Sequence, residues 1–135
     1  MFTGGDILEI NYKHPTLGSG TWFPKSGEDL TVDKGGYRSE DKEDGITSDG
    51  QMIDTINRKR WSIEGSVAWD MAVQDEAAQA SLLGGNPNMA DFTITHINGT
   101  IWGGKGKVVG EVKGSSKDAT MKLKVAGGGT LDKIS

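Results

Sequence analysis

A glycine-rich stretch from Gly99 to Lys105 has the spacing of a phosphate-binding loop, in which backbone N–H groups and a lysine hold phosphate oxygens. The next residue is Gly106, at the position where magnesium ligation requires Ser or Thr. The stretch also follows the turn signal Asn98-Gly99 and precedes a strand pattern, so no helix N-terminus is available to bind an anion. The sequence therefore argues against a nucleotide site.

The acidic run Glu40-Asp-Lys-Glu-Asp-Gly45 has some features of a calcium-binding loop. When Gly45 is placed at the sixth position of such a loop, Lys42 falls at the third position and Gln51 at the twelfth. A lysine cannot ligate a cation there, and the bidentate glutamate is missing. We expect no dedicated metal site, and only weak adventitious binding of cations remains open.

The chain has no cysteine, which excludes disulfides, thiolate metal sites and thiol nucleophiles. Two carboxylate pairs, Asp54 with Glu64 and Asp41 with Glu43, have spacings that an acid–base pair could use. Paired carboxylates are common on exposed strands, and no pattern here indicates a buried member. We therefore interpret them as solvated side chains.

The two histidines are also assigned structural roles. His96 shares a strand face with Phe92 and Ile94 and is interpreted as a half-buried packing residue, whereas His14 beside Pro15 is typical of a turn. No serine stands beside a plausible base, so a catalytic triad has no support. The sequence predicts no enzyme and no cofactor.

Four tryptophans form the last candidate chemistry, a platform for binding a sugar or peptide. Core packing or subunit contact is the alternative interpretation for the same residues. The residues are Trp22, Trp61, Trp69 and Trp102.

Charge is unevenly distributed along the 135 residues. Residues 28–49 contain eight acids and three bases, a net charge of −5, while residues 100–135 have a net charge of +4. Two solvated faces would explain this division, and so would self-association in which the acidic segment of one copy meets lysines of another. The lysines do not interleave with stacking aromatic residues, which argues against a nucleic-acid interface.

Size and hydropathy point to one soluble domain spanning residues 1–135. No apolar run approaches the length of a membrane span, and the first residues lack a basic start followed by an apolar segment. We therefore expect a cytoplasmic origin and no membrane partner.

Period-two alternation dominates the chain and predicts about seven to nine strands. Strands are expected at 6–12, with Leu8, Ile10 and Tyr12 facing inward, and at 18–25, 30–32, 91–97, 100–102, 107–113 and 119–125. Residues 52–70 are expected to form two strands or one bent strand, with the bend at 57–59. One short helix is expected at 74–83. The predicted fold class is mainly β, a small β-sandwich or partly closed barrel with one flanking helix.

The order of these features resembles the tail tube proteins of contractile-tailed bacteriophages. A short first strand is followed by an acidic segment ending in Glu43-Asp-Gly-Ile-Thr-Ser-Asp-Gly-Gln-Met52, a long alternating stretch, and a helix written Glu76-Ala-Ala-Gln-Ala-Ser-Leu-Leu83. The ending, Val109 to Gly129, is similar to the closing hairpin of that family. The resemblance covers nearly the whole chain, although no single motif is diagnostic.

The resemblance implies sixfold rings that stack into a hollow tube through which the genome passes. Inner tubes of pyocin-like particles and type VI secretion belong to the same superfamily. Implied partners are further copies of the chain, an outer contractile sheath, a baseplate or initiator and a tail terminator, and the implied location is the virion tail after assembly in the host cytoplasm. A monomeric β-sandwich that binds a ligand through surface tryptophans is the alternative function.

Three sets of residues are assigned to the assembly. The segment at about 26–51 is expected to be a long acidic loop that carries ring stacking through Glu28, Asp29, Asp33, Arg38, Glu40, Asp41, Glu43, Asp44 and Asp49. The helix is expected to contact a neighbouring subunit through Glu76, Ala77, Ala80 and Leu83. DNA must slide through the lumen, which disfavours dense lysine, so the polar strand face with Asp54, Ser62 and Glu64 is expected to contribute to the wall.

Overall fold

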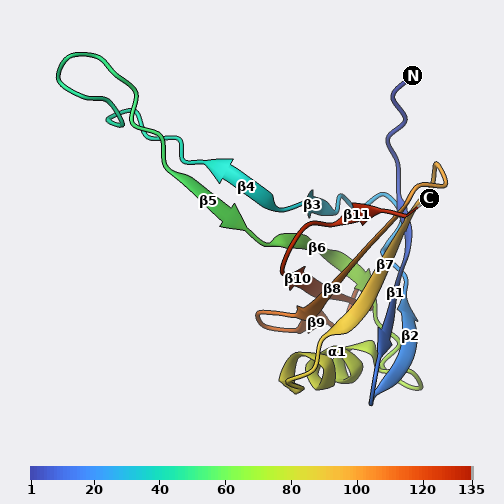
Figure 1. Ribbon diagram of the computed structural model, residues 1–135. Coiled ribbons are helices and arrows are strands. Elements are labelled where there is room, and N and C mark those ends of the chain that lie inside the picture. Colours follow the sequence, from blue (N-terminus) through green and yellow to red (C-terminus); the bar gives the residue numbers. More distant parts are fainter. Residues whose placement is uncertain (135) are drawn as a thin grey trace.

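The computed structural model describes residues 1–134, which form eleven strands and one helix (Figure 1). The elements are β1 (Ile7–His14), β2 (Gly18–Trp22), β3 (Thr31–Asp33), β4 (Gly36–Ser39), β5 (Ile56–Lys59), β6 (Trp61–Ala68), α1 (Glu76–Gly85), β7 (Ala90–His96), β8 (Ile101–Val108), β9 (Lys113–Ser115), β10 (Thr120–Gly127) and β11 (Asp132–Lys133).

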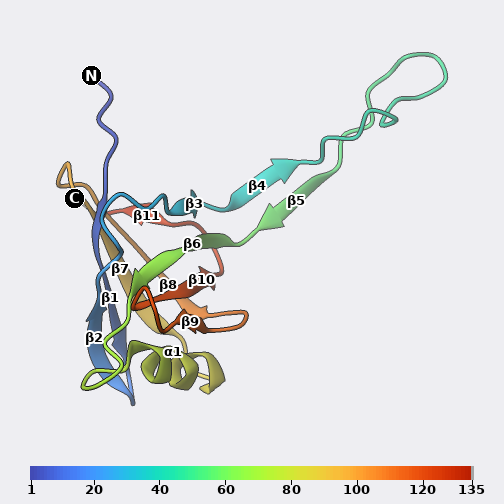
Figure 2. The same cartoon turned by 180° about the vertical axis from the view of Figure 1, so that it is seen from behind.

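One antiparallel sheet runs in the order β2-β1-β7-β8-β10-β6-β3, with β11 beside β8 and β9 beside β10. Strand β8 belongs to both halves of this sheet, because Ile101–Gly106 pair with β7 while Lys107 and Val108 pair with β10. The sheet folds over at β8, so that its two halves face each other without closing into a barrel (Figures 1 and 2). The predicted mainly β sandwich with one helix is confirmed.

Alternating residues of both halves form the core. Trp61 on β6 meets Phe92 on β7 edge to face, with ring centroids 6.4 Å apart, and Trp22 lies 6.2 Å from the same ring. Burying such large aromatic side chains is the main source of stability in a sheet of this size. Around them pack Ile10, Tyr12, Ile63, Val67, Leu83, Ala90, Ile94, Val108, Met121, Leu123, Val125 and Leu131.

Strand β8 is one continuous strand, whereas the sequence predicted a short strand at 100–102 and a separate one beginning at 107. The residues between these two predicted strands include Gly103, Gly104 and Gly106. These glycines permit close approach, because a Cβ at Gly106 would lie 2.4 Å from the carbonyl oxygen of Ala126 and 2.9 Å from the Trp61 ring. Glycine inside this strand makes room for the buried indole.

Strand β1 has a register shift between Ile7 and Glu9. The extra residue reverses the expected facing at this end, since Ile7 is buried while Leu8 is 47% exposed. The prediction of Ile10 and Tyr12 as inward-facing residues is confirmed, and that of Leu8 is wrong.

Helix α1 begins two residues later than the predicted start at 74. Asp75 has the left-handed dihedral φ of 47° and cannot be part of the helix. The Glu76 carboxylate turns back to accept the backbone N–H of Asp70 at 2.6 Å, which fixes the preceding loop. No helix among residues 1–134 is long and apolar enough to span a membrane.

The alternating stretch 52–70 does contain two strands, β5 and β6, separated only by Arg60. Strand β3 pairs with β6, and β4 pairs with β5, so the chain leaves the body as a two-stranded ribbon that bends between the two pairings. At the bend Gly35 has a φ of +76° and forms a bridge with Thr130. A Cβ on Gly35 would lie 2.7 Å from the backbone nitrogen of Trp61, so the bend depends on glycine.

We predict that Gly35→Ala destabilises the fold by about 2 to 4 kcal/mol, because the methyl group adds both a backbone strain and a collision with main-chain atoms of Trp61 and Gly129. Urea denaturation of the purified variant measures the effect. Gly50→Ala is the matched control, because Gly50 also has a positive φ, +94°, but no atom within 4 Å of the added Cβ. Equal destabilisation by the two variants would contradict the role given to the bend.

Candidate assembly surface

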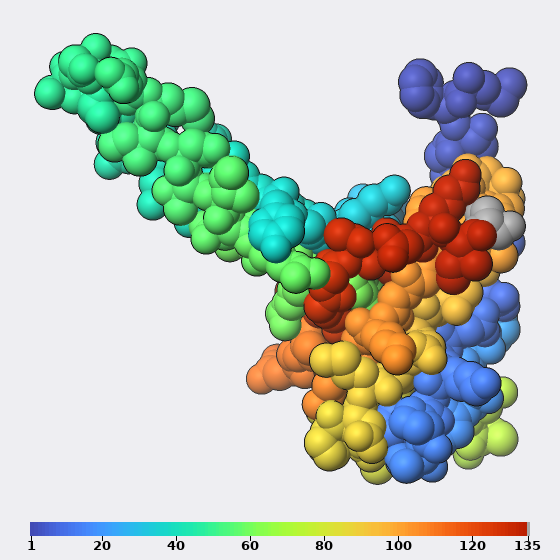
Figure 3. Space-filling model, viewed as in Figure 1, coloured from blue at the N-terminus to red at the C-terminus, as the bar shows by residue number. Residues whose placement is uncertain are grey.

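The most prominent feature outside the sandwich is a projecting hairpin, residues 36–59, which we call the arm (Figure 3). Its base is built from β4 and β5, which pair in the register Gly36 to Lys59 and Ser39 to Ile56. The sequence predicted a loop over most of this segment, because its composition is polar and acidic. Cross-strand backbone pairing, which composition does not report, makes it a ribbon.

Local contacts hold the ribbon together along its length. Arg38 forms a bidentate ion pair with Asp33, in which its Nη1 donates to Oδ2 at 3.0 Å. This ion pair connects β4 to β3. The Arg58 guanidinium lies 5.6 Å from the centre of the Tyr37 ring on the opposite strand. Beyond the strands, the backbone N–H of Glu40 donates to the Thr55 carbonyl at 2.8 Å.

The outer part of the arm is closed by two further backbone contacts. Ile46 and Met52 form an isolated bridge, and the Ile53 N–H donates to the Gly45 carbonyl at 2.8 Å. Between them the Thr47 hydroxyl donates to the Asp49 carboxylate, and the Thr47 Oγ1 accepts the N–H of Gln51 at 2.9 Å. These contacts order the turn without burying apolar surface.

The arm exposes large apolar side chains, which the polar composition of the segment did not predict. Tyr37 is 73% exposed and Met52 is 76% exposed, and the other members of this set are Ile46, Ile53 and Ile56. Single exposed apolar residues are ordinary, but five on one thin ribbon have no core of their own to pack against. The arm therefore has the composition of a segment that is covered by another protein surface.

Charge is divided along the arm. Residues 40–54, the acidic tip, have a net charge of −5, and residues Arg58, Lys59 and Arg60, the basic root, adjoin the body. Lys42 pairs with Glu40 at 2.7 Å, and within residues 1–134 Asp41, Glu43 and Asp44 form no ion pair. The tip thus presents uncompensated carboxylates.

The predicted stacking residues do not all lie on the arm. Glu28 and Asp29 precede β3 on the body, where Glu28 lies 4.0 Å from Lys25. Asp33 ends β3 and serves the ion pair with Arg38. The arm itself carries the remaining members of the predicted set, which are Arg38, Glu40, Asp41, Glu43, Asp44 and Asp49.

Three of the four helix residues predicted to contact a neighbouring subunit face inward in the single chain. Glu76, Ala80 and Leu83 are buried against their own chain, and Ala77 is half-buried. A ten-residue helix with alanine on several sides gave no clear indication of its inner face. The outward face includes Ala78, Ser81 and Leu82, of which Leu82 is 61% exposed.

The residues predicted to share a lumen-facing strand surface are separated. Ser62 and Glu64 lie on the outer face of β6, opposite Asp33 and Thr31 of β3. Asp54 lies on the arm, beyond the end of β5. The period-two pattern was continuous across this point, but the bend at Arg60 removes residues 52–59 from the plane of the sheet.

The tryptophans do not form a binding platform. Trp22 and Trp61 are fully buried, and Trp69 and Trp102 pack half-buried against the core. Trp69 donates its indole N–H to Asp75 at 3.0 Å, and the Lys34 ammonium lies 5.9 Å from the centre of the Trp102 ring. These contacts support the interpretation of the tryptophans as packing residues over their interpretation as a ligand-binding platform.

The histidines have structural contacts. His14, expected in an open turn, is buried, and its Nδ1 accepts the backbone N–H groups of Thr16 and Leu17 at 3.1 and 3.0 Å. Its Nε2–H is then free to donate to the Asn88 carbonyl oxygen at 3.2 Å. His96 is half-buried and packs edge to face on Trp102, as expected for a packing residue.

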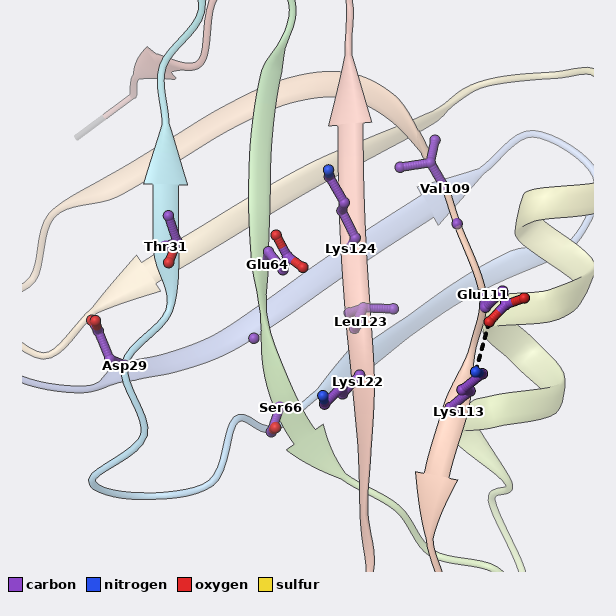
Figure 4. A pocket seen from close by; sticks show the side chains of 12 residues that line it. Asp29, Thr31, Glu64, Ser66, Val109, Glu111, Lys113, Lys122, Leu123 and Lys124 are labelled. Carbon is purple, nitrogen blue, oxygen red and sulfur yellow. Dashed lines mark ion pairs between the residues drawn. The ribbon is translucent and has the colours of Figure 1, made fainter.

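A shallow groove of about 450 Å³ lies on the outer face of β3, β6, β10 and β9 (Figure 4). Acids line the β3 and β6 side, with Asp29 and Glu64, and lysines line the other side, with Lys122 and Lys124 on β10 and Lys113 on β9. Lys113 pairs with Glu111 at 2.8 Å. Within residues 1–134 no three His, Asp or Glu side chains cluster closely enough to hold a metal ion.

No family model matches this chain, and no curated protein is significantly similar to it. Two solved structures are similar over nearly the full length. The tail of an empty gene transfer agent particle, refined as a helix with C6 symmetry, is 18% identical, with 99% of this chain and 100% of that chain covered and a TM-score of 0.58. The virion of a native gene transfer agent particle has a similar chain, at 18% identity, the same coverage of 99% and 100%, and a TM-score of 0.56.

The chain therefore has the fold of a protein of a gene transfer agent tail. This confirms, at the level of the fold, the resemblance to tail tube proteins that the sequence indicated.

Carboxylate pKa values in the arm predict how it responds to acid. The guanidinium of Arg38 lowers the pKa of Asp33 below its ordinary value of 3.8, and the Lys42 ammonium lowers the pKa of Glu40 below 4.5. A group whose pKa is lower in the folded state stabilises that state fully above the ordinary pKa and ceases to do so as the pH falls through the folded value.

We therefore expect the arm to stay ordered at neutral pH and to lose its ion pairs below about pH 4. Titration of the side-chain carboxyl resonances by NMR checks this. In Arg38→Gln the pKa of Asp33 should rise toward its ordinary value, although the Gly35 N–H still donates to this carboxylate. The pKa of Asp6, which the Gly27 N–H and the Ser26 hydroxyl lower at a site outside the arm, should not change. An Asp33 midpoint that is the same with and without Arg38 would show that the ion pair does not form in solution.

Proposed function

We propose that this protein is a structural subunit of a phage-like tail tube, in which copies form sixfold rings that stack around a channel for DNA. The supporting observation is the fold shared over 99% of the chain with the tail of a gene transfer agent particle that has C6 symmetry. A fold alone does not define a function, and the arm supplies the second argument, since its surface requires another chain.

Ring formation is supported by the open edges of the sheet. Strand β2 has β1 on one side only, and its residues Gly18–Trp22 include neither proline nor a charged side chain. An unprotected edge of this kind pairs readily with another strand. A head-to-tail contact that closes on itself produces a ring, and neighbouring sheets then continue one another.

Ring stacking is the role we propose for the arm, together with the body residues Glu28, Asp29 and Asp33 predicted with it. Its apolar side chains would be buried, and its carboxylates paired, on a copy in the next ring. The outward face of α1 is proposed to contact a neighbour within the assembly, through Ala78, Ser81 and Leu82.

The lumen wall has two candidate surfaces. The predicted residues Ser62 and Glu64 share their face with Lys122 and Lys124, whose ammonium groups would bind DNA phosphates and retard sliding. On the outer face of β2, β1 and β7, Thr21, Asn11 and Thr93 form a neutral row that is aligned in register. In the next row of this face, Asp91 lies between Lys13 and Lys105. We propose the neutral row as the principal lumen wall.

The proposal includes the expected setting. The subunit would be assembled in the host cytoplasm and reside in the virion tail, with a baseplate or initiator and a terminator at the tube ends and a sheath outside. It performs no catalysis and binds no cofactor. The alternative function, a monomeric module that binds a ligand through surface tryptophans, has no support, because these tryptophans are buried in the core or packed against it.

Electron microscopy of the purified protein, with its mass in solution, tests the function. We expect rings or tubes with a central hole, at a threshold concentration typical of self-association. A variant in which residues 38–57 are replaced by Asn-Gly should keep the fold, since the arm lies outside the core, but should not form long tubes. The replacement removes both sides of the hairpin, so no unpaired strand remains.

The control for this variant is its circular dichroism spectrum and melting temperature, which should match those of the full chain. Tubes of unchanged length without the arm would exclude the stacking role. A wild-type chain that stays monomeric at high concentration, even with preformed tube ends as seeds, would contradict the tail tube function itself.

A helical reconstruction of the tube tests the lumen assignment. We expect Asn11, Thr21 and Thr93 to face the channel, because a neutral wall gives DNA no phosphate partner. A channel lined instead by Ser62 and Glu64 would reverse the choice between the two faces.

A further inference from the structure

The arm has two charge blocks in a fixed order. The basic root lies at the body, and the acidic tip lies at the far end, with the exposed Ile53 and Ile56 between most of the tip and the root. A partner surface that receives the whole arm must therefore present acidic, apolar and basic patches in sequence. This order is a stronger constraint than net charge.

One end of the body is acidic and apolar. It contains α1, the loop before it and the turn between β1 and β2, and it lies opposite the end from which the arm and the N-terminal segment project (Figures 1 and 2). We call it the helix end. Residues 70–91 contain four acids and no lysine or arginine, and of these acids Glu76 is buried while Asp70, Asp75 and Asp91 reach the surface. The helix end also exposes Leu17, Met71, Val73, Leu82 and Met89.

Polar side chains fix the loops of the helix end. His14 joins the β1–β2 turn to the Asn88 carbonyl, and the Asp70 carboxylate accepts the N–H groups of Ala72 and Val73 at 3.2 and 3.3 Å. These contacts hold loops in place whose apolar side chains point into solvent, and Val73 is 84% exposed. An ordered apolar surface rimmed by acids is typical of a contact site.

Lysines lie next along the body. The lysine side of the groove in Figure 4 is formed by Lys113, Lys122 and Lys124 on the hairpin of β9 and β10. Within residues 1–134 neither Lys122 nor Lys124 forms an ion pair. In Figures 1 and 2 this hairpin lies between α1 and the origin of the arm.

We propose that the arm of one copy lies along the body of the next, with its basic root against the acidic helix end and its acidic tip on the lysine side of the groove. An arm that leaves the first body meets an acidic and apolar patch on the next copy, and then a basic patch. This order is complementary to the order along the arm, whose root is basic and whose tip is acidic. The arm cannot occupy these surfaces of its own chain, because it projects away from the helix end (Figure 3). The inference rests on the proposed self-assembly and names the surfaces that perform it.

Charge reversal with rescue tests the tip contact. Lys122→Glu with Lys124→Glu should lower the yield of tubes at least tenfold, and so should Glu43→Lys with Asp44→Lys. Combining all four changes restores opposite charges across the contact and should bring tube formation back. Lys105→Glu, an exposed lysine on β8 outside the groove, is the matched control and should leave tube formation unchanged.

Cysteine cross-linking tests the same contact while leaving the other charged residues of the chain unchanged. The chain contains no cysteine of its own that could interfere. Asp44→Cys with Lys124→Cys should give, on oxidation of assembled tubes, a ladder of covalent multimers that extends beyond six subunits. Lys59→Cys with Val73→Cys should give the same ladder for the root contact. Each single variant should give no ladder.

The outcomes separate the two proposals. Tubes formed equally well by the groove variant, a failure of the fourfold variant to recover, or the absence of a ladder for either pair would overturn the assigned surfaces while leaving the tail tube function intact. A ladder that stops at six would place the contact within a ring and overturn the stacking arrangement. A wild-type chain that forms no tubes would instead contradict the proposed function.

Discussion

The pairing of β3 with β6 and of β4 with β5 is effectively one ladder, interrupted only at the bend between Gly35 and Arg60. On the inner side of the bend this ladder belongs to the sandwich, and on the outer side it has no core. The bend is fixed from within, because Gly35 packs on the backbone of Trp61, one of the two fully buried tryptophans of the core. The direction of the arm therefore depends on how the core is packed.

This arrangement divides the molecule into two regions with different sources of stability. The sandwich is stabilised by buried aromatic and aliphatic side chains from both halves of the folded sheet. The arm has backbone pairs, exposed ion pairs, side-chain hydrogen bonds and one cation–π contact, which contribute little in water. Such a segment is suited to acquiring most of its stability from the surface that it contacts, and this links its fold to assembly.

The same division explains the distribution of charge. A monomer gains nothing from placing carboxylates at the tip of a ribbon and lysines on a distant hairpin, since solvent screens charges at such separations. In the proposed head-to-tail stack, identical copies would bring these regions together at every interface. Because one sequence must supply both sides of a heterologous contact, complementary patches on opposite parts of a single subunit are the expected result.

The sequence by itself determined most strands of the sandwich, the single helix and the presence of an unusual acidic segment, because side-chain alternation and charge are local properties. Its motifs also gave no support for a nucleotide site, a metal site or a catalytic site. Four features were decided only by tertiary structure. The bulge at Leu8 depends on pairing with β7, and the continuity of β8 through its glycines depends on the position of Trp61. The inner face of α1 depends on the sheet beneath it, since alanines give no directional signal. The arm is the clearest case. A polar composition predicts a loop, and only the partner strand, seventeen or more residues further along the chain, provides the hydrogen bonds that make it a ribbon.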